Sequence, residues 1–141
     1  MSYPILLCTY TNVAVDNLVE GLANTTLDAL RIGYNGKVKS TLIEHTLEKK
    51  LETHPLAFSY KKLKDDMEER MQRKKNLEQR IRELQKNTNR RHIARLDAME
   101  LDSIGLERQI HSLETRAWGL FRRMVRDIVT AADVVRVIWP S

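Results

Sequence analysis

The sequence predicts an α/β fold in which a partial parallel sheet, built from the two ends of the chain, carries an inserted antiparallel helical hairpin. Near the N-terminus, short apolar strands alternate with amphipathic helices, and a further apolar stretch lies near the C-terminus. This order is typical of parallel sheets. Between the two ends, apolar residues recur in steps of three and four along a charged stretch, which is the spacing of a coiled-coil seam.

The N-terminal part of the chain is predicted to contain a strand, a polar turn and a helix. The apolar run Ile5–Thr9 is followed by the polar elbow Tyr10–Asn12 and by a helix from about residue 13 to residue 23. Hydroxyl groups, an amide and a helix N-terminus can all donate hydrogen bonds to a phosphate group. The elbow is therefore a candidate ligand site, although Asn12 is also a good helix N-cap.

A second strand and a short helix follow this first unit. The strand is expected at Ala29–Gly33, and an Asn-Gly pair within residues 34–39 marks a turn. We expect one helix from about Thr41 to Leu51, which ends before Pro55 because a proline disfavours helical backbone in the preceding residue. Residues 1–55 thus form the first α/β part.

Residues 56–128 are predicted to form the hairpin, a coiled-coil stalk with a turn at residues 87–92. Each arm has about 25–30 residues and a length of roughly 40 Å. This region contains 18 basic and 12 acidic residues, in a chain of 141 residues with a formal charge of +5. The seam consists of Leu63, Met67, Arg70, Lys74, Leu77, Ile81 and Leu84 in the first arm, and of Leu96, Met99, Ser103, Leu106, Ile110, Leu113, Ala117, Leu120 and Met124 in the second.

Residues 129–141 are predicted to return to the sheet as a further strand. Cys8 is the only cysteine, so an intrachain disulfide is excluded and an intracellular location, in cytoplasm or nucleus, is expected. No apolar run approaches the roughly 20 residues of a membrane span, so no membrane partner is expected. The four histidines do not have metal-ligand spacing, and we expect no metal site.

Three stretches of the chain resemble one known family. Residues 11–18, Thr-Asn-Val-Ala-Val-Asp-Asn-Leu, are similar to motif Ia of superfamily 1 helicases, in particular of the group that contains the nonsense-mediated-decay RNA helicase and its immunoglobulin-mu-binding relatives. In that group the motif reads roughly Ser-Asn-x-Ala-Val-Asp-Asn-Leu. Residues 30–33, Leu-Arg-Ile-Gly, and 132–135, Ala-Asp-Val-Val, are similar to later strands of the family, which has a helical stalk between them.

The resemblance implies a partial P-loop NTPase (RecA-like) sheet and a function in ATP-dependent translocation along single-stranded RNA or DNA. It also implies that Thr9, Thr11 and Asn12 contact the sugar-phosphate backbone of the strand. The stalk is then a lever or spacer that can hold a protein partner. ATP and magnesium are implied as cofactors of the full-length family.

The nucleotide-binding motifs of that family do not occur in this sequence. None of the 5 glycines lies in a glycine-rich loop ending in Gly-Lys-Thr or Gly-Lys-Ser, and the acidic Asp-Glu-Ala motif that holds magnesium is missing. We therefore expect an internal fragment of a motor domain, inactive alone, with no catalytic residue and no cofactor site of its own. Two alternatives stay open: a coiled-coil interaction or scaffold protein, and a small basic helical nucleic-acid binder.

Overall fold

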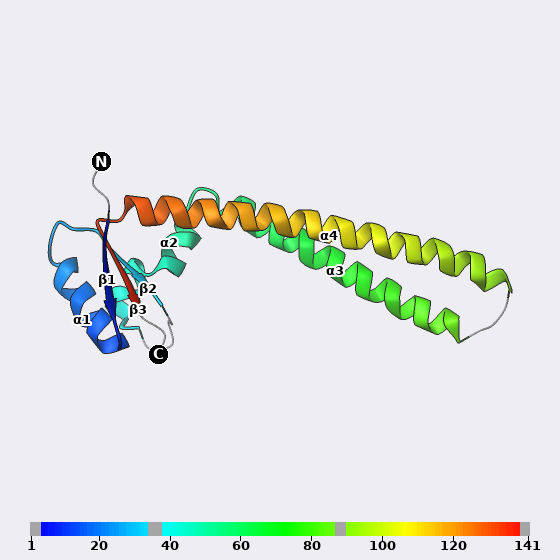
Figure 1. The fold of residues 1–141 in the computed structure, drawn as a ribbon, viewed down its shortest axis with the longest axis horizontal. Helices are drawn as coiled ribbons and strands as arrows, with labels where there is room; N and C mark the ends of the chain where they lie inside the picture. The colour runs from blue at the N-terminus through cyan, green and yellow to red at the C-terminus, as the bar shows by residue number, and fades with distance from the viewer. Residues whose placement is uncertain (1–3, 34–37, 87–89, 139–141) are drawn as a thin grey trace. The chain divides into compact units, whose positions relative to one another are not determined.

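The structure is a computed structural model that describes residues 4–33, 38–86 and 90–138, with the backbone alone described at residues 90–92 and 134–138 (Figure 1). Its elements fit the mixed α/β class that the sequence predicts. In chain order they are β1 (Ile5–Thr9), α1 (Asn12–Ala23), β2 (Ala29–Ile32), the 3-10 helix η1 (Ser40–His45), α2 (Leu47–Thr53), α3 (Ala57–Gln85), α4 (Arg90–Ala131) and β3 (Val134–Ile138).

The chain divides into two compact units. The sheet unit comprises Met1–Ala57 and Arg122–Ser141, and the hairpin unit comprises Phe58–Phe121. Helix α4 belongs to both, since its last turns lie in the sheet unit. None of the helices within the described ranges is both long and apolar enough to cross a membrane.

The sheet has the strand order β1-β3-β2, and both pairs of strands are parallel. The last strand of the chain is thus the central one. Asp133 joins the three strands where β3 begins, because its carbonyl oxygen accepts from Ile5 N at 3.0 Å and its N–H donates to Asp28 O at 2.9 Å. Its carboxylate also accepts from Asp28 N at 2.8 Å. The carboxyl ends of all three strands therefore lie at one edge of the sheet.

Strand β2 is covered on both faces, and successive residues of a strand point to opposite faces. Leu30 packs with Ile128 of α4 and with Ala132, which directly follows this helix; Leu47 and Leu51 of α2 pack against the same cluster. On the other face, Arg31 pairs with Asp16 of α1. Figure 1 shows α1 and α2 on opposite sides of the sheet. The two faces therefore have different cores, one apolar and one containing a buried ion pair.

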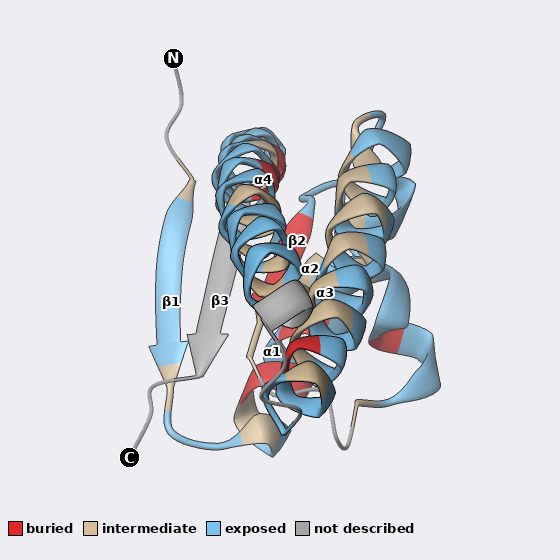
Figure 2. Cartoon of the chain, turned by 90° about the vertical axis from the view of Figure 1, so that its right-hand side faces the viewer, coloured by how far each residue is buried: buried red, intermediate tan, exposed pale blue. Residues whose placement is uncertain are grey.

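Strand β1 is exposed along almost its whole length, in contrast to β2. The exposed fractions of Ile5 and Leu6 are 62% and 61%, although these neighbours point to opposite faces of the sheet. Figure 2 shows β1 in the colour of exposed residues. A continuous apolar run is typical of strands that are buried on both faces. The sequence of β1 therefore fits a more enclosed environment than the described residues supply.

The helix expected from about Thr41 to Leu51 is two elements, η1 and α2, so this expectation is wrong. Thr46 separates them with extended backbone (φ −77°, ψ 148°) and caps α2, because its Oγ1 accepts from Lys49 N at 3.3 Å. The same hydroxyl donates to Ile43 O at 2.6 Å. A threonine favours the N-cap position over a helix interior, which explains the interruption.

The hairpin unit consists of α3 and the greater part of α4, packed antiparallel. Arg70 Nε donates to Gln109 Oε1 at 3.0 Å, and four residues further along α3 Lys74 lies 3.7 Å from Glu107, which precedes Gln109 in α4. The two helices therefore run in opposite directions. All of the expected seam residues are buried or half-buried. Of the expected turn, residues 87–89 lie outside the described residues, and α4 already begins at Arg90.

Candidate functional site

The three residues of the candidate site lie together where β1 passes into α1. Thr9 is the last residue of β1, Thr11 precedes α1, and Asn12 is its first residue. This elbow belongs to the edge of the sheet at which the parallel strands end. Ligands of open parallel sheets bind in the crevice beyond the carboxyl ends of the strands, so the elbow has the position expected of a binding site.

Thr11, and not Asn12, is the N-cap of α1. Its backbone is extended, and its Oγ1 accepts from Ala14 N at 3.2 Å. The Thr9 hydroxyl donates to Thr11 O at 3.2 Å and so braces the turn. Among the described residues, the N–H groups of Asn12 and Val13 have no acceptor. The start of α1 therefore offers two backbone donors beside the Thr11 hydroxyl.

Asn12 takes part in a polar cluster with Arg31 and Asp16 beneath α1. Arg31 Nη2 donates to Asn12 Oδ1 at 3.1 Å, and Arg31 Nε donates to Asp16 Oδ1 at 2.9 Å. The side chain of Arg31 is 0% exposed and that of Asp16 is 6% exposed. The first turns of α1 are thus tied to β2 by charge-assisted hydrogen bonds, which are stronger than those between neutral groups.

This cluster was not predicted from the sequence. Arg31 was considered there only as part of the Leu-Arg-Ile-Gly stretch at residues 30–33 and not as a partner of Asp16 or Asn12. A signal was present: Arg31 is the one charged residue of an apolar strand, and a buried arginine needs a carboxylate. Asp16 lies between Val15 and Val19, which are both fully buried. An acidic residue on the buried face of an adjacent helix is the partner that such an arginine requires.

A second polar pair, Lys39 and Glu20, lies on the surface near the C-terminal half of α1. Lys39 Nζ donates to Glu20 Oε2 at 2.8 Å, and both side chains are about half exposed. The hydrogen bond to Glu20, together with the negative charge of this carboxylate, raises the pKa of Lys39 above its ordinary value. The upward shift extends the pH range over which Lys39 carries a positive charge further into alkaline conditions.

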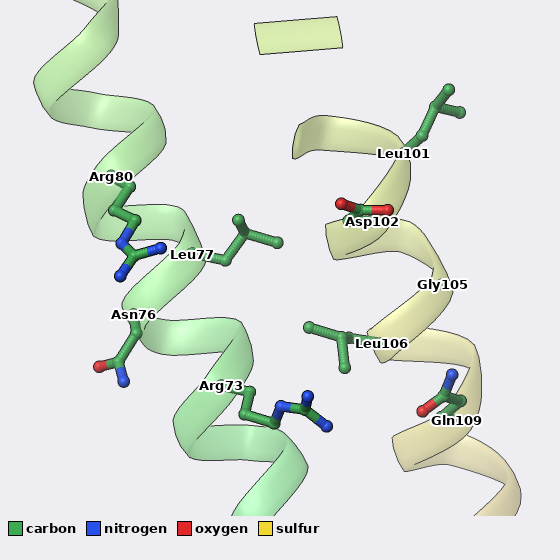
Figure 3. Close-up of a pocket in the computed structure, with 9 residues that line it drawn as sticks. All are labelled: Arg73, Asn76, Leu77, Arg80, Leu101, Asp102, Gly105, Leu106 and Gln109. Carbon is green, nitrogen blue, oxygen red and sulfur yellow. The ribbon is translucent and has the colours of Figure 1, made fainter. Parts of the chain in front are cut away.

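The hairpin unit has a groove of about 600 Å³ between α3 and α4. Figure 3 shows Leu77 and Leu106 facing each other across it, with Arg73 and Arg80 on the α3 side. Within the described residues neither arginine forms an ion pair, whereas Lys74 between them is close to both Glu78 and Glu107. The groove thus combines an apolar floor with two exposed cations.

The described residues offer no site for a nucleotide or a metal ion. No group of three or more His, Cys, Asp or Glu side chains that could hold a metal ion occurs in the described ranges. The sequence places no glycine-rich phosphate loop before any helix. The described residues therefore do not fit ATP with magnesium.

Comparison with known protein families gave a match. A family model described as an AAA domain matches residues 2–136. A comparison with curated proteins gave no match. The family match covers both units, from the strand before the elbow to the central strand of the sheet.

Proposed function

The chain belongs to the helicase-type AAA domain family, and from this premise we propose that it is part of an ATP-dependent nucleic-acid motor whose elbow at Thr9, Thr11 and Asn12 contacts a single strand. The observation that carries the proposal is the group of unused donors at the start of α1. The N-terminus of a helix attracts anions, and its N–H groups suit a phosphate oxygen. Such contacts position a strand without reading its bases, so RNA and DNA are both compatible.

The exposure of β1 supports a further part of the proposal, that the chain is a fragment of a larger motor. We propose that additional elements of a P-loop NTPase sheet cover Ile5 and Leu6 in the working protein and supply the nucleotide and magnesium sites. Burial of apolar surface stabilises a protein by about 25 cal/mol per Å². Ile5 and Leu6 are largely exposed on opposite faces of the sheet, so packing of additional elements against both faces would be favourable. The hairpin then acts as the stalk of the motor domain.

The single-strand contact is tested by replacing Asn12 with alanine. Because Thr11 is the cap of α1, this change leaves the cap intact and removes one donor amide from the elbow. We expect the affinity for a fluorescently labelled homopolymeric single strand to fall roughly tenfold, and equally for different bases. Titration of the strand, followed by fluorescence anisotropy, measures this change.

The matched control is Asn17→Ala, which removes an exposed amide from the same helix outside the elbow. Its affinity should equal that of the unchanged chain. Thr11→Ala removes both a hydroxyl and the cap, so it should lower affinity and melting temperature together. If Asn12→Ala binds the strand as tightly as Asn17→Ala, the elbow is only the start of a helix and the proposed contact is refuted.

Binding of a protein partner by the hairpin unit is a second candidate function, and the groove favours it. Arg73 and Arg80 are seven residues apart and so lie on one side of α3, about 10 Å apart along its axis. Together with Leu77 and Leu106, they form a surface that fits an amphipathic helix carrying acidic residues. In this alternative, the hairpin is the scaffold and the sheet unit anchors it.

A thermal unfolding experiment distinguishes a closed hairpin from a coiled coil between chains. A peptide of residues 58–121, the hairpin unit, should be strongly helical, with a melting temperature that is constant over roughly a hundredfold range of concentration, because its seam closes within one chain. Circular dichroism at several concentrations measures both quantities. A melting temperature that rises with concentration would instead favour self-association and the scaffold function.

A further inference from the structure

The orientation of the Asn12 amide is fixed by the chemistry of its neighbour. A guanidinium group can only donate hydrogen bonds, so the Asn12 atom 3.1 Å from Arg31 Nη2 must be the carbonyl oxygen Oδ1. The Nδ2 group, which carries both donor hydrogens of the amide, is on the other side of the same planar group. Arg31 therefore determines which end of the amide remains for a ligand.

Arg31 is itself held rigidly enough to impose this orientation. Its side chain is 0% exposed, it belongs to β2, and its Nε donates to Asp16 at 2.9 Å. Asp16 follows Asn12 by four residues, so both acceptors lie on one face of α1. The guanidinium is planar, and its fixed fork can serve two acceptors at once, whereas a lysine has a single flexible ammonium.

We infer that Arg31 is a positioning residue for the single-strand site: it holds Asn12 Oδ1 so that Nδ2 donates to a phosphate of the bound strand. This inference rests on the proposed function, because it assigns a role within the same site. Arg31 does not touch the strand. Arg31 affects strand binding by orienting the Asn12 amide, and Asp16 affects it by holding the Arg31 guanidinium in place.

A double-mutant cycle between Arg31 and Asn12 tests this role. Arg31→Lys keeps the buried positive charge near Asp16 but loses the fork, so binding of a labelled oligouridylate strand should weaken roughly tenfold, as for Asn12→Ala. The combination of both changes should bind no more weakly than Asn12→Ala alone, because the two residues act through one contact. Leu51→Ala is the control, since it perturbs the cluster on the opposite face of the sheet and should leave affinity unchanged.

The possible outcomes separate this inference from the proposed function. If Asn12→Ala weakens binding but Arg31→Lys does not, the elbow binds the strand and the role of Arg31 is refuted. That role is refuted as well if the two losses multiply in the combined variant, because Arg31 would then act independently of Asn12. If Asn12→Ala has no effect, the proposed strand contact itself fails, and the role of Arg31 falls with it.

A measurement on the unchanged chain keeps the inference testable even if the Arg31 variant does not fold. Nuclear magnetic relaxation of side-chain amide nitrogens should give Asn12 an order parameter near that of a rigid backbone, about 0.85, because Arg31 restrains it. Asn17, which is exposed on the same helix, is the internal control and should be below about 0.6. An Asn12 amide as mobile as that of Asn17 would overturn the positioning role.

Discussion

Replacing Asp16 with alanine should lower the free energy of unfolding of the sheet unit by about 3–5 kcal/mol. The reason is that removing one partner of a buried ion pair leaves the charge of the other partner buried without the carboxylate that compensates it. The pair formed by Asp16 and Arg31 meets this condition, because the side chains are 6% and 0% exposed. Chemical denaturation followed by a probe in the sheet unit measures the change. An effect of this size is a large share of the roughly 5–15 kcal/mol by which domains are typically stable.

Two further variants show whether the lost charge is the cause. Asp16→Asn keeps an oxygen that can accept from Arg31 Nε and removes only the negative charge, so its effect should be intermediate. Glu20→Ala breaks the exposed pair with Lys39 on the same helix and should shift the unfolding midpoint far less. Equal losses for Asp16→Ala and Glu20→Ala would contradict the structural importance of the buried pair.

The parts of the fold that the sequence predicted well are those with a strong local signal. The bounds of β1, Ile5–Thr9, agree with the expectation, because an apolar run followed by a polar turn specifies a strand end. Helix α1 begins within one residue of its expected start. The sequence alone does not distinguish the cap, because the adjacent residues Thr11 and Asn12 are both good capping residues; in the structure the cap is Thr11.

Other features depend on contacts between distant residues, and there the local sequence was ambiguous. The run from Ile128 to Ala132 is short and apolar, so it suits a strand or a buried helix equally. The helix continues to Ala131, and Ile128 of its last turn is buried together with Leu30 of β2. Strand β3 consequently begins at Val134, and residues 139–141 of the expected return strand lie outside the described residues.

The turn that contains Thr9, Thr11 and Asn12 was predicted, whereas the hydrogen bonds that connect it to β2 were not. Thr9, Thr11 and Asn12 do meet at one turn, as residues adjacent in sequence must. What the sequence could not show is that Asn12 is linked to Arg31, nineteen residues away. Such a link requires α1 to lie over one particular face of β2, and no motif in the sequence specifies this arrangement.

Replacing Leu30 with alanine should destabilise the sheet unit by about 2–5 kcal/mol while leaving the hairpin unit intact. Leu30 is 0% exposed and is the residue on which the last turns of α4 and helix α2 converge, so its truncation opens a cavity between them. The buried residues Ile81 and Leu113 both belong to the hairpin unit. Truncation of Leu30 should therefore destabilise the sheet unit without affecting the stability of the hairpin unit.

Amide hydrogen exchange resolves the two units residue by residue. In Leu30→Ala, exchange should become roughly 30-fold faster or more throughout β1, β2 and α1, since each 1.4 kcal/mol of lost stability is about a factor of ten. Amides within residues 60–85 and 95–120 should keep their protection. Leu113→Ala is the matched control, a leucine truncated in the other core, and should show the reverse pattern. Uniform acceleration in both variants would contradict this expectation, because it would mean that the two units unfold as one.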